Sequence, residues 1–260
     1  MKAAGHPYFD TRFAALAHRG GAKLATNRGR ENTLRAFSNA VDLGYRYLET
    51  DVHLTSDGHL VAFHDESLDR VTDRTGRIAD LRLSEVRAAK VGPEHIPTLD
   101  EVLDSFDVRL NIDIKAPGAE QPLVHALHRH NAWHRVCVGS FSELRLQRFR
   151  MLAGSRAATS VGPAGVAATL AAVRLGGVGV APIGGAYQVP LTAFVAGRRV
   201  QVVTEKFIRL AHRWGKAVHV WTIDDEAMMQ RLIDMGVDGL VSDQIDLLKY
   251  LLECRGLWPS

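Results

Sequence analysis

The chain has 260 residues, a hydrophobic fraction of 46%, a charged fraction of 23% and a formal net charge of +3. This composition is typical of a soluble globular protein whose core needs no disulfide bond or structural metal. The small net charge and the scattered basic residues argue against a nucleic-acid partner.

Strand-like runs alternate with helical patterns along most of the chain. The predicted strands cover residues 13–17, 47–54, 109–115, 136–140, 157–161, 186–190, 217–222 and 239–242. The first predicted helix begins at Leu34 and ends before Gly44, and the others cover residues 98–105, 121–130, 142–152, 165–175, 205–214, 226–235 and 245–254. Eight strands that alternate with helices fit an α/β fold of the (β/α)8 TIM-barrel type better than a doubly wound sheet. We therefore predict one domain over residues 1–260.

A long segment separates the second and third predicted strands. It covers about residues 66–97 and contains a turn followed by a short helical pattern over residues 84–90. Insertions that follow a barrel strand emerge at the face where TIM-barrel active sites lie. We expect this insertion to form a lip or lid over a pocket.

Two predicted strands carry polar residues along one face. Successive side chains of a strand point to opposite faces, so the aliphatic residues of 109–115 share one face and the polar residues share the other. The polar residues on these two strands are Asn111, Asp113, Lys115, Glu49, Asp51 and His53. If both polar faces line one enclosed space, the buried charges require a cation or an anionic ligand.

Further candidates for chemistry stand at the ends of predicted strands, where the reactive groups of a barrel lie. The motifs, in chain order, are His18-Arg19-Gly20, Glu31-Asn32-Thr33, Glu49-x-Asp51, His64-Asp65, Lys115, Trp221-Thr222, Gly236-Val237-Asp238-Gly239 and Asp243. Each motif is short, but their joint order and spacing resemble the glycerophosphodiester phosphodiesterase family. The resemblance runs from about residue 15 to residue 248.

The resemblance implies a TIM barrel with a divalent cation on Glu49, Asp51 and Asp113. These residues offer oxygen atoms and no sulfur, the preference of Mg²⁺ or Ca²⁺. His18 and His64 match the acid–base pair of the family. Imidazole can accept and donate protons near neutral pH, and each positioned transfer accelerates a reaction by roughly 10²- to 10⁴-fold.

The resemblance also implies residues that bind the substrate. Arg19 and Lys115 would meet the phosphodiester, arginine through paired hydrogen bonds and lysine as a point charge. Glu31 and Asn32 precede the first helix, where ligand contact and simple helix capping are both open. Trp221 would form an apolar wall for a glycerol group, with core packing as the alternative. Asp243 matches the end of the family pattern without an assigned role.

Two positions depart from the family pattern. Arg30 stands where the family usually has proline, which loosens a turn beside Glu31. Asp113 stands where the family usually has glutamate, and the missing methylene shortens the reach of the carboxylate by about 1.5 Å. A closer strand, a bridging water or weaker metal binding would each accommodate this difference.

The function predicted from these residues is metal-dependent hydrolysis of a small glycerophosphodiester to glycerol 3-phosphate and an alcohol. A lysophospholipase D or sphingomyelinase D-like activity is one alternative, for which the Ala-, Gly- and Val-rich residues 161–180 offer either an apolar entrance or ordinary helix packing. A catalytically silent phosphodiester-binding protein is another. The chain has no secretory signal pattern and no apolar run of the roughly 18 residues that a membrane span requires. We therefore expect a cytoplasmic protein without stable membrane insertion.

Overall fold

Eight parallel strands form a nearly closed barrel in the computed structural model, which describes residues 5–195 and 197–258. The barrel strands are β1 (Ala14–His18), β2 (Tyr47–Leu54), β6 (Arg109–Ile114), β7 (Val136–Gly139), β8 (Ala158–Thr159), β9 (Ala186–Pro190), β12 (Ala217–Trp221) and β13 (Gly239–Ser242). Their order around the sheet is β8-β7-β6-β2-β1-β13-β12-β9. A parallel bridge between Ser160 and Ala186 joins the two end strands. The predicted TIM barrel is therefore confirmed.

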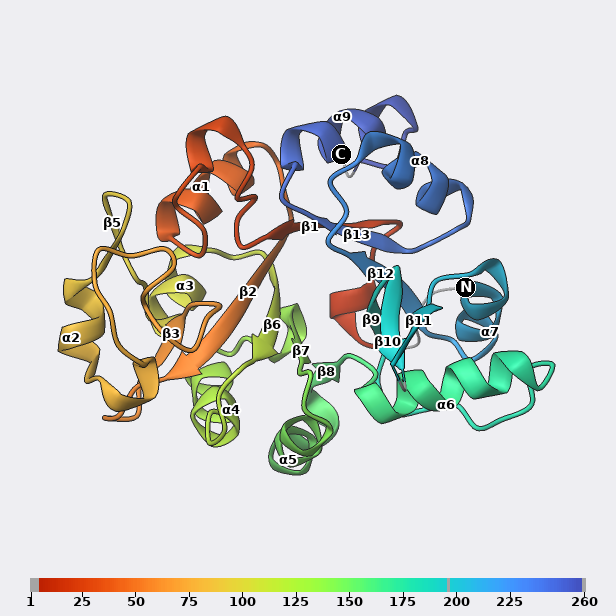
Figure 1. The fold of residues 1–260 in the computed structure, drawn as a ribbon, viewed down its shortest axis with the longest axis horizontal. Coiled ribbons are helices and arrows are strands. Elements are labelled where there is room, and N and C mark those ends of the chain that lie inside the picture. Colours follow the sequence, from red (N-terminus) through yellow and green to blue (C-terminus); the bar gives the residue numbers. More distant parts are fainter. Residues whose placement is uncertain (1–4, 196, 259–260) are drawn as a thin grey trace.

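Helices surround the barrel (Figure 1). They are α1 (Leu34–Asp42), α3 (Leu99–Ser105), α4 (Glu120–Arg129), α5 (Glu143–Ala153), α6 (Pro163–Arg174), α7 (Glu205–Arg213), α8 (Glu226–Asp234) and α9 (Ile245–Cys254). Local sequence explains where several of them begin. Thr98 and Glu101 form the predicted capping box of α3, since each side chain accepts a backbone N–H at the helix start. None of the described helices is long and apolar enough to cross a membrane.

Short 3-10 turns complete the connections of the barrel. They are η1 (Pro7–Phe9), η2 (Ala25–Asn27), η3 (Ile78–Asp80), η4 (Trp133–Arg135) and η5 (Gly154–Arg156). The η1 turn packs beneath the barrel, where the hydroxyl of Tyr47 donates a hydrogen bond of 2.7 Å to the carbonyl of Tyr8. The η1 turn thus closes the end of the barrel opposite the strand C-termini.

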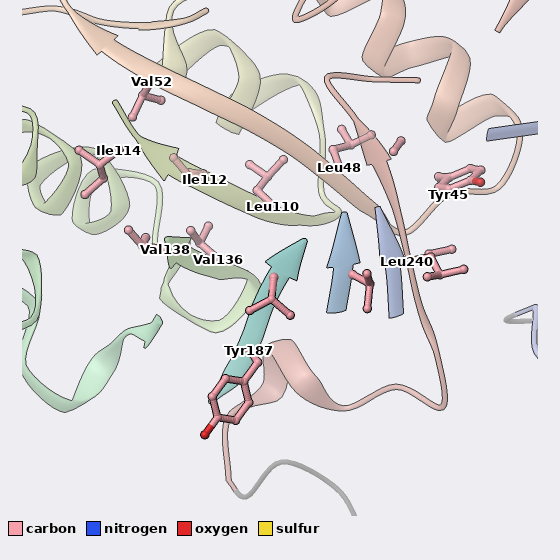
Figure 2. Packing of buried hydrophobic residues seen from close by; sticks show 14 of the residues in the cluster. Tyr45, Leu48, Val52, Leu110, Ile112, Ile114, Val136, Val138, Tyr187 and Leu240 are labelled. Carbon is pink, nitrogen blue, oxygen red and sulfur yellow. The ribbon is translucent and has the colours of Figure 1, made fainter. Parts of the chain in front are cut away.

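The main hydrophobic core lies between the strands and the helices. Figure 2 shows aliphatic side chains of neighbouring strands in this cluster, among them Leu110 and Ile112 of β6 and Val138 of β7. These side chains are fully buried. The other face of each strand looks into the barrel. There a second cluster of mostly small residues, including Ala14, Ala186 and Ala217, fills the lower part of the barrel.

The insertion after β2 is a small structure with its own apolar cluster. It begins with β3 (Leu60–Ala62), which pairs antiparallel with β2, and continues through η3, α2 (Leu83–Ala88), β4 (Lys90–Val91) and β5 (Glu94–His95). Its buried side chains include Phe63, Leu68 and Ile78. Figure 1 shows the insertion beside α1 and α3, across the barrel from α6 and α7.

A second extension follows β9 and was not among the predicted elements. Strands β10 (Thr192–Val195) and β11 (Arg198–Gln201) form an antiparallel hairpin outside the barrel sheet. Because it leaves the C-terminal end of β9, it stands at the same face of the barrel as the ends of the other strands. It was missed because residues 176–201 are rich in glycine and lack a clear period.

Candidate active site

A cavity of about 380 Å³ opens where the barrel strands end. The predicted site residues that line it are His18, Arg19, Glu49, Asp51, His64, Asp113, Lys115 and Trp221. Glu31 and Asn32, also predicted, do not line it. Residues from five separate segments of the chain are thus gathered in one pocket, as the strand-end positions predicted.

The turn after β1 holds Arg19 in an unusual backbone conformation. Arg19 has φ of 51°, in the left-handed region that non-glycine residues rarely adopt. Its N–H bonds to the carbonyl of Glu49 at 3.1 Å and to the Glu49 carboxylate at 3.2 Å. The next residue must be glycine, because a Cβ on Gly20 would lie 2.8 Å from the Cβ of Ala36. Strained residues of this kind cluster at ligand sites.

His18 is held from one side by Asp243. Its Nδ1 lies 2.8 Å from Oδ1 of Asp243, while its Nε2 lies 3.9 Å from the Glu49 carboxylate. Burial favours the neutral ring, but the hydrogen bond to Asp243 and the charge of Glu49 raise the pKa of His18 above its usual value. A carboxylate on Nδ1 keeps the ring proton there and leaves Nε2 for proton exchange in the cavity.

His64 is held in the same way by Asp65. The Nδ1 atom of His64 lies 2.5 Å from Oδ1 of Asp65, and Arg70 donates to both carboxylate oxygens at 2.5 and 3.1 Å. Burial opposes ionisation, but the bonds from Arg70 and His64 lower the pKa of Asp65 to about 2. Arg70 comes from the insertion, which thus contacts the partner of His64, although no residue of 66–97 lines the cavity.

Asp51, Asp113 and Lys115 form a buried charged group. The ammonium of Lys115 lies 2.7 Å from Oδ2 of Asp113 and 3.1 Å from Oδ1 of Asp51. These two aspartates face each other in the register of β2 and β6. Burial raises the pKa of Asp113 despite the neighbouring Lys115, and Oδ1 of Asp113 is buried without a hydrogen-bond partner. One ammonium therefore leaves an oxygen atom of this group unsatisfied.

Glu49 adds a third buried carboxylate, and the nearby His18, Arg19 and Lys115 do not offset its burial. Burial, followed by the charge of Asp51, raises the pKa of Glu49 to about 7. Within residues 5–195 and 197–258, no group of three His, Cys, Asp or Glu side chains lies close enough together to hold a metal ion in the present side-chain positions. The oxygen-only donors, the orphaned Asp113 oxygen and the disfavoured charge of Glu49 nevertheless fit a hard divalent cation.

Glu31 and Asn32 lie behind the cavity wall. Glu31 accepts hydrogen bonds from Arg19 at 3.0 Å and from Arg70 at 2.7 Å. Asn32 is buried, has φ of 58°, and donates to Asp51 at 3.5 Å. The following residue, Thr33, is the N-cap of α1. Glu31 and Asn32 therefore contact the residues that line the cavity.

Apolar side chains also line much of the cavity, beside the charged residues. Trp221 packs edge to face against Phe141 with ring centroids 5.5 Å apart, and the Lys115 ammonium lies 4.9 Å above the Phe141 ring. The other apolar lining residues come from β9, α6, the β10–β11 hairpin and residues directly beside them, namely Val161, Pro163, Val166, Ala167, Leu170, Val189, Pro190, Ala193 and Val202. The cavity thus combines charged and apolar residues, and its lining also includes the uncharged polar residues Asn111, Ser140, Ser160, Gln188 and Thr222.

Sequence reasoning missed Arg70, Phe141 and the hairpin. Arg70 gave no signal, because it lies in an irregular part of the insertion and its partners Glu31 and Asp65 are 39 and 5 residues away. Phe141 directly follows the end of a predicted strand, so its position at a strand end was a usable signal. The contact of Asp243 with His18 joins residues 225 positions apart.

Comparison with known proteins gives the family of the chain. The model of the glycerophosphoryl diester phosphodiesterase family matches residues 18–247. Probable glycerophosphodiester phosphodiesterase 2 of Mycobacterium tuberculosis is 40% identical over 95% of this chain and 93% of its own length. The glycerophosphodiester phosphodiesterase of Caldanaerobacter subterraneus subsp. tengcongensis is 31% identical over 93% of this chain and 98% of its own length.

A similar structure is a phosphodiesterase of Oleispira antarctica, solved in complex with the product sn-glycerol-3-phosphate. It has a TM-score of 0.73 and 24% identity, and the match covers 92% of this chain and 96% of that one. At this identity it supports the fold alone. From the family match and the two relatives, the chain belongs to the glycerophosphoryl diester phosphodiesterase family and is a phosphoric diester hydrolase.

Proposed function

We propose that this enzyme hydrolyses glycerophosphodiesters to glycerol 3-phosphate and an alcohol, with His18 and His64 as the acid–base pair and a divalent cation on Glu49, Asp51 and Asp113. The names of the relatives give the substrate class, and the Oleispira antarctica protein was solved with the corresponding product. The observation that carries the proposal is that two histidines line one cavity and that an aspartate contacts Nδ1 of each.

The two histidines suit a displacement at phosphorus. Each ring uses Nδ1 to contact an aspartate, so each has Nε2 left for transferring a proton. One ring takes the proton of the nucleophile, which is water or a neighbouring hydroxyl of the substrate, and the other protonates the leaving alkoxide. Two rings are needed because these transfers occur at opposite sides of the phosphorus atom.

The cationic side chains suit the charge of the phosphodiester. Arg19 and Lys115 line the cavity and supply N–H donors for the phosphoryl oxygens, whose charge grows in the transition state. Mg²⁺ or Ca²⁺ bound by the oxygens of Glu49, Asp51 and Asp113 would polarise a phosphoryl oxygen as a Lewis acid. The cation would also relieve the repulsion that raises the pKa of Glu49.

Phosphorus NMR of the purified protein with glycerophosphocholine tests this function. We expect glycerol 3-phosphate and choline as products, loss of turnover with EDTA, and recovery with Mg²⁺, Ca²⁺ or Mn²⁺. His18→Gln and His64→Gln should each lower kcat by roughly 10²- to 10⁴-fold. His128→Gln is the matched control, since His128 is exposed on α4 and should leave kcat unchanged.

Three outcomes would overturn parts of the proposal. Absence of turnover with every one of the three cations would favour a silent phosphodiester-binding protein. Full activity in EDTA would remove the cation from the reaction. Activity of His18→Gln or His64→Gln equal to that of His128→Gln would remove that histidine from catalysis.

A further inference from the structure

We infer that this enzyme docks reversibly on anionic lipid membranes through the end of the barrel opposite the active site. The docking surface consists of the connection between α6 and β9, residues 175–185, the end of α5 and the cationic side chains around them. The inference does not rest on the proposed function, because this surface contains none of the residues that line the cavity.

The α6–β9 connection is an exposed apolar segment. It consists of glycine, leucine, valine, alanine, proline and isoleucine, so none of its side chains can form a hydrogen bond. Its large side chains, with exposed fractions of 70–89%, are Leu175, Val178, Val180 and Ile183. Met151 and Leu152 add two exposed apolar side chains at the end of α5. A concentration of exposed apolar side chains marks a surface that another molecule or a membrane covers.

This surface lies away from the active site. Each helix of a (β/α)8 barrel runs back from the C-terminal end of one strand to the N-terminal end of the next. The end of α5 and the α6–β9 connection therefore both lie at the N-terminal end of the strands, and Figure 1 shows α5 and α6 as neighbouring helices. Arg150 of α5 joins the two, since its guanidinium donates a hydrogen bond of 3.1 Å to the carbonyl of Ile183. A docked enzyme would thus keep its cavity open to water.

The charge in this part of the chain has one sign. Residues 144–204 contain seven arginines and no lysine, aspartate or glutamate. Arg156 follows α5 and Arg174 ends α6, so both lie at the same end of the barrel as the connection, and both are exposed. The exposed aliphatic side chains are therefore flanked by positive charge.

Cationic side chains also hold the connection in place. The ammonium of Lys216 donates a hydrogen bond of 2.6 Å to the carbonyl of Gly184, as Arg150 does to that of Ile183. Backbone carbonyls carry no net charge, so these hydrogen bonds do not neutralise either cation. Burial, and after it the charge of Arg150, lowers the pKa of Lys216. An anion bound at this surface would relieve the repulsion between the two cations.

A membrane with anionic headgroups fits this combination better than a protein does. Aliphatic side chains enter the interfacial layer of a bilayer, while arginine and lysine attract lipid phosphates. A symmetric dimer would place the same cations of both copies against each other. A specific protein partner is usually recognised through hydrogen bonds and aromatic anchors, and the side chains of the connection offer neither.

Flotation with lipid vesicles tests the inference. We expect the protein to bind vesicles of equimolar phosphatidylglycerol and phosphatidylcholine, and to bind vesicles of phosphatidylcholine alone far less. Each cation near an anionic surface contributes about fivefold to the partition coefficient. Binding should therefore weaken steeply as the salt concentration rises.

Variants locate the surface. Val180→Asp should lower the partition coefficient roughly tenfold or more, since an inserting aliphatic side chain becomes a charge that the lipids repel. Arg174→Glu should also lower it roughly tenfold, because it reverses one charge. The matched controls are Tyr250→Asp, at an apolar residue of α9 that is 60% exposed, and Arg231→Glu, at an exposed arginine of α8. Both helices lie across the barrel from α5 (Figure 1), so the controls should leave binding unchanged.

Four outcomes would overturn the inference. They are no binding to the anionic vesicles at low salt, equal binding to phosphatidylcholine alone, equal losses in the controls, and a dimer that Val180→Asp dissociates. Size-exclusion chromatography with light scattering detects the dimer, which would assign the surface to a second copy of the chain. Circular dichroism confirms that each variant is folded. Turnover of glycerophosphocholine is measured without vesicles, so a failure of the proposed function and a failure of membrane docking are separate results.

Discussion

Replacing Asp243 by Asn tests whether His18 depends on its carboxylate partner. The two side chains meet at 2.8 Å, and both are largely buried, with exposed fractions of 16% for His18 and 15% for Asp243. The amide of Asn has the same shape but no charge. It can also donate to Nδ1, which would move the ring proton to Nε2 and leave His18 in the wrong tautomer.

The structure sets the size of the expected effect. A hydrogen bond to a charged group is worth about 1.5–3 kcal/mol, which corresponds to roughly 10- to 150-fold in rate. We expect kcat of Asp243→Asn to fall by about 10²-fold with little change in KM, because Asp243 does not line the cavity. Removing the carboxylate also lowers the pKa of His18, since the hydrogen bond to Asp243 helps to raise it.

The assay is the pH profile of kcat with glycerophosphocholine, with circular dichroism to check folding. If His18 acts as the base, the acid limb of the profile moves to lower pH; if it acts as the acid, the alkaline limb moves to lower pH. Asp246→Asn is the control, since Asp246 is exposed at the start of α9. A kcat close to that of the parent enzyme with an unmoved profile would refute the role of Asp243.

Three further predictions concern other charged residues. Asp113→Glu should keep or raise activity and lower the cation concentration needed for half-maximal rate, because the longer carboxylate extends toward the cavity; loss of folding would instead indicate a packed salt bridge. Arg70→Met should lower kcat roughly tenfold by releasing Asp65 from two bonds, whereas Arg74→Met, on the same insertion, should leave kcat unchanged. Burial lowers the pKa of His219 to about 4. As the pH falls, the imidazole of His219 takes up its proton at a higher pH in the unfolded chain than in the folded protein. The free energy of unfolding should therefore fall by about 3 kcal/mol between pH 6.5 and pH 4. Denaturant unfolding should show that His219→Gln loses this part of the pH dependence, and an unchanged slope would contradict the burial of a neutral ring.

The sequence alone determined the barrel and its charged strands. Alternation of Leu110, Ile112 and Ile114 with polar residues is a local property, because the two faces of any strand follow from a period of two. The same holds for the capping box of Thr98 and Glu101, whose partners are three residues apart. Such patterns are predictable because the backbone geometry of a few neighbouring residues determines where their side chains point.

Tertiary structure decided which of these groups act together. Arg70 contacts Glu31 and Asp65 across 39 and 5 positions, and His18 contacts Asp243 across 225. No local period encodes such pairs, because they depend on how the barrel closes and where the insertion folds back. The apolar lining of the cavity is of the same kind: the apolar character of α6 is visible in its composition, but only the closed barrel and the hairpin place that surface in the same cavity as His18 and His64.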